Sequence, residues 1–147
     1  MLPERNKMAV PTWERNESKT EYLNRIYELN INIAKIVMNK PKKYRQNYGD
    51  AIVKSGLEAL KYSQIANTVY VSASMPESDK SLRRNMLIKA KGTIMNISTA
   101  SYIFLELCKN QDGEKQDKIS KQEQYIGSTC YDIIQMLSGV IKSDSKR

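Results

Sequence analysis

The sequence contains no histidine, and this absence removes more chemistry than any other feature of its composition. Without imidazole the chain has no Ser-His-Asp or Cys-His nucleophile system, no imidazole-based proton transfer near neutral pH and no mixed Cys/His zinc site. The Glu-x-x-His sites that di-iron four-helix bundles require are excluded as well.

Cysteine, glycine and proline are also scarce. Six glycines and four prolines in 147 residues are too few for a fold built from strands and tight turns. The two cysteines, Cys108 and Cys130, lie far apart in apolar helical contexts. We therefore expect them to be small core residues of a reduced cytosolic protein.

Long apolar runs are missing too. The most apolar window, residues 93–108, is interrupted by Asn96, Ser98, Thr99 and Ser101. It falls short of the roughly 18 apolar residues that a membrane span requires. The first ten residues contain no apolar signal-peptide region. We expect a cytoplasmic protein without a membrane partner.

The sequence contains none of the common catalytic or metal-binding motifs. The chain has no Gly-x-x-x-x-Gly-Lys loop, no Cys-x-x-Cys motif and no metal-ligand grouping. Its acid pairs, Glu77 with Asp79 and Glu114 with Asp117, fall where loops or helix caps are expected, so solvated carboxylates explain them. We expect neither an enzyme nor a cofactor.

Four windows have the 3-4 spacing of amphipathic helices. Their apolar stripes are Tyr22, Ile26, Leu29, Ile33 and Ile36; Tyr48, Ile52, Ala59, Ala66 and Tyr70; Leu87, Ala90, Ile94, Ile97, Ser101, Phe104 and Cys108; and Ile126, Cys130, Ile133, Leu137 and Val140. Capping boxes are predicted at Ser18-x-x-Glu21 and Ser120-x-x-Glu123, and the third helix is predicted to start near Pro76. Gly49 and Gly56 weaken the second helix and indicate close approach of a neighbour.

These windows predict one all-α domain. Short connections between four helices favour an antiparallel up-down-up-down four-helix bundle. The polar residues 1–16 are expected to form a flexible N-terminal arm, residues 17–143 the bundle and residues 144–147 a charged tail.

The net charge is +8, which favours contact with polyanions. Basic residues are concentrated in NKPKKYRQNYGD, residues 39–50. Lys40 is favoured by the negative end of the first helix dipole, which explains it structurally. Lys42, Lys43 and Arg45 instead fall at the positive start of the second helix, where each costs roughly 0.3–1 kcal/mol at low salt. This cluster suggests an anionic partner, with a solvated turn as the alternative.

Other basic residues are grouped along predicted helices. Projected at 100° per residue, Lys80, Arg84 and Lys91 share one flank of the third helix, Lys89 lies on the other, and Lys54 and Lys61 share a face of the second. The alternative is an ordinary solvated face. Tyr44 and Tyr48 are candidates for stacking on bases, although packing on the core is favoured for them.

Tyrosine is abundant, with nine residues against one phenylalanine. A large apolar ring with a polar tip suits half-buried protein contacts. Because Tyr27, Tyr62, Tyr102 and Tyr131 fall outside the predicted core stripes, a homo-oligomer interface is a reasonable expectation.

Four stretches carry a family resemblance: VPTWERNESKTEYL (10–23), NKPKKYRQNY (39–48), LRRNMLIKAKGTI (82–94) and VIKSDSKR (140–147). They are similar to a bacterial four-helix-bundle family. That family includes the proteins encoded in 23S ribosomal RNA intervening sequences and the accessory variability determinant proteins of diversity-generating retroelements. The resemblance extends from about residue 10 to the C-terminus.

The resemblance implies a ring-like homopentamer of antiparallel four-helix bundles with no activity of its own. It implies two partners, a reverse transcriptase and nucleic acid, with RNA first and DNA second, in error-prone copying of a template RNA. The basic positions that match are Lys42, Lys43, Arg45, Arg83, Arg84, Lys89 and Lys91. One departure is that Pro11-Thr12-Trp13-Glu14 dilutes the basic arm expected before the first helix. The ribosomal-insert branch shares the fold, so a protein-interaction scaffold is the alternative function.

Overall fold

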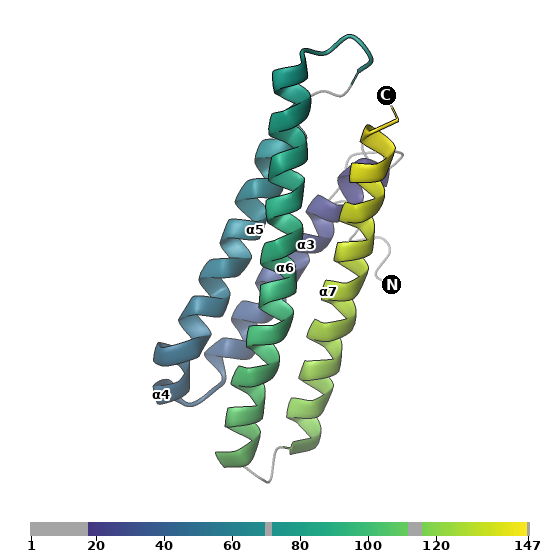
Figure 1. Ribbon diagram of the computed structural model, residues 1–147. Helices are drawn as coiled ribbons and strands as arrows, with labels where there is room; N and C mark the ends of the chain where they lie inside the picture. The colour runs from purple at the N-terminus through teal and green to yellow at the C-terminus, as the bar shows by residue number, and fades with distance from the viewer. Residues whose placement is uncertain (1–17, 70–71, 112–115, 147) are drawn as a thin grey trace.

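The computed structural model describes residues 18–69, 72–111 and 116–146, and every regular element within those ranges is helical (Figure 1). The elements are α3 (Ser18–Met38), α4 (Lys42–Tyr44), the π-helical segment η1 (Arg45–Gly49), α5 (Asp50–Thr68), α6 (Glu77–Gln111) and α7 (Gln116–Asp144). Because α4, η1 and α5 follow one another without a break, the described residues form four long helical segments. The prediction of an all-α four-helix bundle is confirmed. The arm at 1–16 and Tyr70 lie outside the described residues.

The apolar stripes of α6 and α7 match the sequence patterns. Every residue predicted on these two stripes is buried, including Cys108 and Cys130. On α3 the stripe ends at buried Val37, while Ile36 is only half-buried. The 3.6-residue period therefore identifies the core face of three helices.

The second helical segment differs from its prediction. Tyr48 is exposed, because Gly49 occupies the buried position in η1. The buried residues of α5 are mostly small: Ile52, Gly56, Ala59, Ser63 and Ala66. This face brings the backbone of α5 close to its neighbours.

Two glycines mark the closest approaches, as the sequence predicted. A Cβ atom added at Gly49 would lie 2.7 Å from Cγ1 of Val37, and one at Gly56 would lie 2.6 Å from Oδ1 of Asn30. Asn30 Nδ2 donates to the carbonyl oxygens of Gly56 and Ile26, each at 2.9 Å. This side chain thus ties α3 to α5 at a point where only glycine fits.

The starts of α6 and α7 test the predicted start signals. α6 begins at Glu77, directly after Pro76, as expected. The second capping box is wrong, because α7 already includes Gln116 and Ser120 lies inside the helix. Glu123 instead accepts a hydrogen bond from Lys109 Nζ at 3.0 Å.

Side-chain contacts define the two ends of the bundle. At the arginine end, named for Arg83, the end of α5, the start of α6 and the end of α7 meet (Figure 1). At the lysine end, α4, the end of α3, the end of α6 and the start of α7 meet. Among the described residues, no helix is long and apolar enough to cross a membrane.

Candidate functional site

The basic residues predicted to bind a partner lie in three parts of the bundle. Lys40, Lys42, Lys43 and Arg45 are at the lysine end. Lys54 and Lys61 are on α5, and Lys89 of α6 lies near Tyr62 of α5. Lys80, Arg83, Arg84 and Lys91 are on the remaining flank of α6 and at the arginine end. The structure does not bring them into one patch, so each group is described separately.

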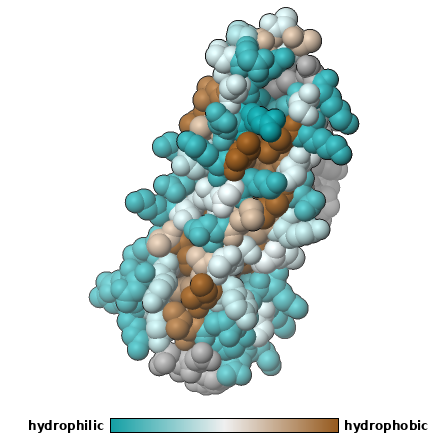
Figure 2. All heavy atoms as spheres, viewed as in Figure 1, coloured by the Kyte–Doolittle hydropathy of each residue, from teal (hydrophilic) through white to brown (hydrophobic). Residues whose placement is uncertain are grey.

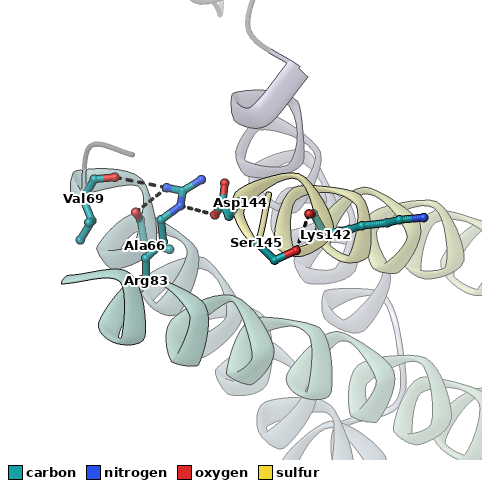
Figure 3. Close-up of polar contacts among 6 residues, drawn as sticks. All are labelled: Ala66, Val69, Arg83, Lys142, Asp144 and Ser145. Atoms are coloured by element: carbon teal, nitrogen blue, oxygen red, sulfur yellow. Dashed lines mark hydrogen bonds and ion pairs between the residues drawn. The ribbon is translucent and has the colours of Figure 1, made fainter. Parts of the chain in front are cut away.

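Arg83 is a structural residue. Its side chain is only 5% exposed, and its Nε lies 2.6 Å from Oδ2 of Asp144 (Figure 3). Its Nη1 donates to the carbonyl oxygens of Ala66 at 2.8 Å and Val69 at 3.4 Å. The guanidinium joins α5, α6 and α7, and this placement removes Arg83 from any surface site.

Tyr22 shares the buried surroundings of Arg83. The Tyr22 hydroxyl and Arg83 Nη2 are both buried, and their geometry falls short of a hydrogen bond. Burial raises the pKa of Tyr22, Arg83 acts to lower it and Asp144 acts to raise it. The arginine end therefore has a polar interior.

The surface beside Arg83 has mixed charge. A cavity of about 280 Å³ is lined by Lys80 and Arg84 but also by Glu77 and Asp144. Lys91 lies seven residues after Arg84, on the same face of α6. The acids make this area a poor surface for a polyanion.

The lysine end contains two basic residues with structural partners. Lys40 Nζ donates to Oε1 of Gln122 at 2.7 Å, joining the end of α3 to α7. Arg45 Nη1 donates to the carbonyl oxygen of Met38 at 3.4 Å, near the end of α3, where carbonyls lack helical partners. These contacts hold both cations at this end of the bundle.

Lys42 and Lys43 are exposed at the start of the second helical segment, as the sequence predicted. Lys43 Nζ lies 5.0 Å from the centroid of the Tyr44 ring, which packs partly against the core. An acidic residue is absent from the first turn of α4. The structure therefore places these two lysines at the positive end of a helix dipole, where cations are unfavourable.

A groove between α3 and α7 adds basic residues that the sequence patterns did not reveal. This lysine groove has a volume of about 420 Å³ and is lined by Asn32, Lys35, Ile36, Lys118, Lys121, Gln122 and Tyr125. Asn32 Nδ2 donates to the Tyr125 hydroxyl at 2.6 Å. Lys40 joins the groove through Gln122. The sequence signal was weak, because Lys35 lies 83 residues before Lys118 and their proximity depends on helix packing.

The carboxylates behind the lysine groove are already paired. Lys109 Nζ lies 2.9 Å from Oε2 of Glu106 and 3.0 Å from Oε1 of Glu123. Burial and then Glu106 raise the pKa of Glu123, while the hydrogen bond from Lys109 lowers the pKa of Glu106. Asp117 is exposed in the first turn of α7, and Glu28 lies one turn before Asn32. Cations still predominate around the groove.

The helices α5 and α6 hold the remaining predicted residues. Lys89 Nζ lies 5.7 Å from the centroid of the Tyr62 ring, so the two helices place a cation and an aromatic ring side by side. Lys54 and Lys61 are exposed on α5, with Glu58 between them. These basic residues are more scattered than those at the lysine end.

No group of three or more potential metal-ligating Cys, Asp or Glu side chains occurs within the described ranges. Burial raises the pKa of the Cys130 thiol to about 12 and also raises that of Cys108. These thiols stay protonated at neutral pH and are poor nucleophiles. Their chemistry is that of packed core residues.

Comparison with family models, with curated proteins and with solved structures gives no match to this chain. The resemblance to the ribosomal-insert and retroelement family therefore stays a prediction from the sequence. Inference about function depends on the geometry of the basic surfaces.

Proposed function

We propose that this protein is a non-enzymatic, nucleic-acid-binding accessory protein whose main contact surface is the lysine end. One observation carries the proposal: Lys35, Lys118 and Lys121 converge from two helices in one groove, which Lys40 joins through Gln122. Lys42 and Lys43 are exposed at the same end of the bundle. The groove lining includes no carboxylate. A surface of this kind attracts phosphates and releases their counterions, giving affinity without base-specific contacts.

The family resemblance extends this proposal to specific partners. We propose association with a reverse transcriptase and its template RNA in a diversity-generating retroelement, in the cytoplasm. An up-down-up-down antiparallel order of helices belongs to the same proposal. It is supported by contacts of the α3 end with the α7 start, and of the α6 start with the α7 end.

Assembly into a ring is the other part of the resemblance. Two exposed apolar stripes support it: Tyr27, Ile31 and Met38 on α3, and Ile88, Met95 and Tyr102 on α6. Figure 2 shows the face formed by α6 and α7, on which apolar residues form a broken diagonal band between hydrophilic areas. Exposed apolar stripes of this kind indicate contacts with other protein surfaces.

The test is fluorescence anisotropy of a labelled RNA at several salt concentrations, with the wild type and two triple variants. Lys35→Gln with Lys118→Gln and Lys121→Gln removes the groove charges. Arg84→Gln with Lys142→Gln and Lys146→Gln removes the same charge from exposed positions at the arginine end. We expect the groove variant to bind more weakly and to reduce the slope of log K against log salt by about 2, since each single-strand phosphate contributes roughly 0.7.

The control variant should bind nearly as tightly as the wild type. Equal losses in both variants would mean that net charge alone drives binding, and would remove the groove from the proposal. Absence of RNA binding by the wild type even at low salt would contradict the proposed function.

A protein-interaction scaffold of the ribosomal-insert type is the second candidate, and the two apolar stripes favour it. Light scattering after size-exclusion chromatography distinguishes the two candidates when combined with the RNA titration. A stable oligomer that ignores RNA would support the scaffold.

A further inference from the structure

A small groove between the second helical segment and α6 has the shape and chemistry of a nucleobase site. This tyrosine slot has a volume of about 190 Å³, and its lining includes Asn47, Tyr48, Ser55, Asn96, Ile97 and Ala100. It lies in the half of the bundle nearer the lysine end, on the face opposite the lysine groove.

The walls of the tyrosine slot are mostly apolar, and its polar groups include two side-chain amides. Ile97 and Ala100 provide an apolar floor, and the side chain of Asn96 is exposed. Asn47 Nδ2 donates to the carbonyl oxygen of Lys43 at 2.9 Å, which fixes its side chain and leaves its own carbonyl oxygen as an acceptor. Amides offer both donors and acceptors, which are the groups that base edges present.

Tyr48 is the aromatic residue of the slot and is 45% exposed. Its neighbour Tyr44 packs against the core instead. The difference arises because Tyr48 belongs to the π-helical segment η1, in which Gly49 takes the buried position. Short π-helical stretches are rare and are often found at functional sites.

Lysines flank the tyrosine slot along the helix axis. Lys43 lies one turn before Asn47, and Lys54 lies beside Ser55; both are exposed. Eleven residues separate them, which corresponds to about 16 Å along a helix. Asp50 lies between them in the sequence, but the three lysines Lys42, Lys43 and Lys54 keep the local charge positive. Phosphates on both sides of a bound base would therefore meet a cation.

We propose that the tyrosine slot binds one unpaired nucleobase of a single-stranded nucleic acid. Tyr48 stacks on the base, Asn96 and Asn47 contact its edge, and Lys43 and Lys54 contact the flanking phosphates. The inference rests on the proposed function and adds a preference for single strands over duplex, because a paired base is enclosed between its neighbours and cannot enter a side pocket.

The first experiment measures affinity for an unstructured single-stranded RNA, for the same strand with abasic sites and for its duplex. Tyr48→Ala is compared with Tyr131→Ala, which removes an exposed tyrosine of α7 remote from the slot lining. Stacking on an aromatic side chain is worth about 1–3 kcal/mol per base, so we expect Tyr48→Ala to weaken single-strand binding by about 5- to 150-fold. The salt dependence of binding should be the same in Tyr48→Ala as in the wild type. Tyr131→Ala should bind the single strand as tightly as the wild type.

A second variant reports on the slot directly. Tyr48→Trp in a Trp13→Phe background places the only tryptophan at the slot, and its fluorescence should be quenched by the single strand but not by the abasic strand. The slot proposal would be overturned if Tyr48→Ala bound single-stranded RNA as tightly as the wild type, and if the wild type bound abasic or duplex RNA as tightly as the intact single strand. Salt-dependent RNA binding in that case would leave the proposed function standing. A wild type that binds no RNA would overturn both.

Discussion

Arg83 at the arginine end and the exposed lysines at the lysine end use their charge in opposite ways. At the arginine end, Arg83 is buried, paired with Asp144 and bonded to two backbone carbonyls, so its charge serves to hold three helices together. At the lysine end, Lys42, Lys43 and the lysines of the groove are exposed to solvent. The comparison shows that a count of cations says little about binding until each charge has been assigned a partner.

The two ends are also held together differently. The arginine end relies on the charged network around Arg83. The lysine end combines the ion pairs of Lys109 with close packing, since the backbone at Gly49 lies directly against Val37. Three substitutions test this contrast, and their expected effects on the free energy of unfolding decrease from Arg83 through Gly49 to Tyr22.

Arg83→Met should produce the largest loss. Removing the guanidinium leaves Asp144 and the carbonyls of Ala66 and Val69 without their partner, and breaking a buried ion pair in this way costs about 3–5 kcal/mol. Arg84→Met, at the exposed neighbouring position, should change stability by less than about 0.5 kcal/mol. Urea unfolding monitored by circular dichroism measures both.

A second variant keeps the Arg83 prediction testable if Arg83→Met does not fold. Asp144→Asn retains an acceptor and should lose about 1.5–3 kcal/mol, the usual contribution of a hydrogen bond to a charged group. Equal stability of the Arg83 and Arg84 variants would show that the contrast between the ends is wrong.

Gly49→Ala should cause the next largest loss. The new methyl group would overlap Cγ1 of Val37, and overpacking costs about 1–3 kcal/mol, partly offset by the better helix propensity of alanine. Gly92→Ala is the matched control, because a Cβ there meets no atom within 4 Å, and it should stabilise by about 0.5–1 kcal/mol. Adding Val37→Ala to Gly49→Ala should relieve the overlap. A stabilising Gly49→Ala would mean that the lysine end is loosely packed.

Tyr22→Phe should have the smallest effect at neutral pH, a gain of about 1 kcal/mol, because it removes a buried hydroxyl that lacks a hydrogen bond. Its effect grows at alkaline pH. Burial raises the pKa of Tyr22 above 10.0, so the folded state keeps a proton that the unfolded state releases. The contribution of Tyr22 protonation to the free energy of unfolding is therefore fully present below pH 10.0. It is lost as the pH rises toward the pKa of Tyr22 in the folded state.

The measurement is denaturant unfolding of the wild type and Tyr22→Phe between neutral pH and about pH 11, above the ordinary tyrosine pKa. Cys130, with its pKa of about 12, lowers the stability of both proteins in this range, so only the difference between them reports on Tyr22. Parallel pH profiles would contradict the buried surroundings assigned to Tyr22.

The sequence predicted the core of α6 and α7 because their apolar residues follow the helical period without interruption. It failed at Tyr48, because a π-helical turn adds one residue and rotates the residues before it relative to α5. It also placed Arg83 on the surface, although the 4-3-4 spacing from Arg83 through Leu87 and Ala90 to Ile94 continues the core stripe and could have indicated burial.

The candidate site was only partly accessible from sequence. Lys42 and Lys43 were recognised because their conflict with the helix dipole is a local property. Lys35, Lys118 and Lys121 were not, because their convergence requires that α3 and α7 be known to pack together. Local patterns identify a charge that is out of place, whereas a groove between distant helices depends on the tertiary structure.

The small buried residues of α5 have a consequence for partial unfolding. Ile52 is the single large apolar side chain among the fully buried residues of α5. Larger side chains of α5, namely Val53, Leu60 and Tyr62, pack only partly against the core. Because its fully buried positions are mostly small, α5 exposes less apolar area on separating from its neighbours than a helix with large, fully buried side chains would. We therefore expect the α5 backbone amides to exchange with solvent hydrogen sooner than those of α6 and α7. Because Lys54 and the tyrosine slot belong to this segment, a bound strand that holds α5 in place should slow that exchange.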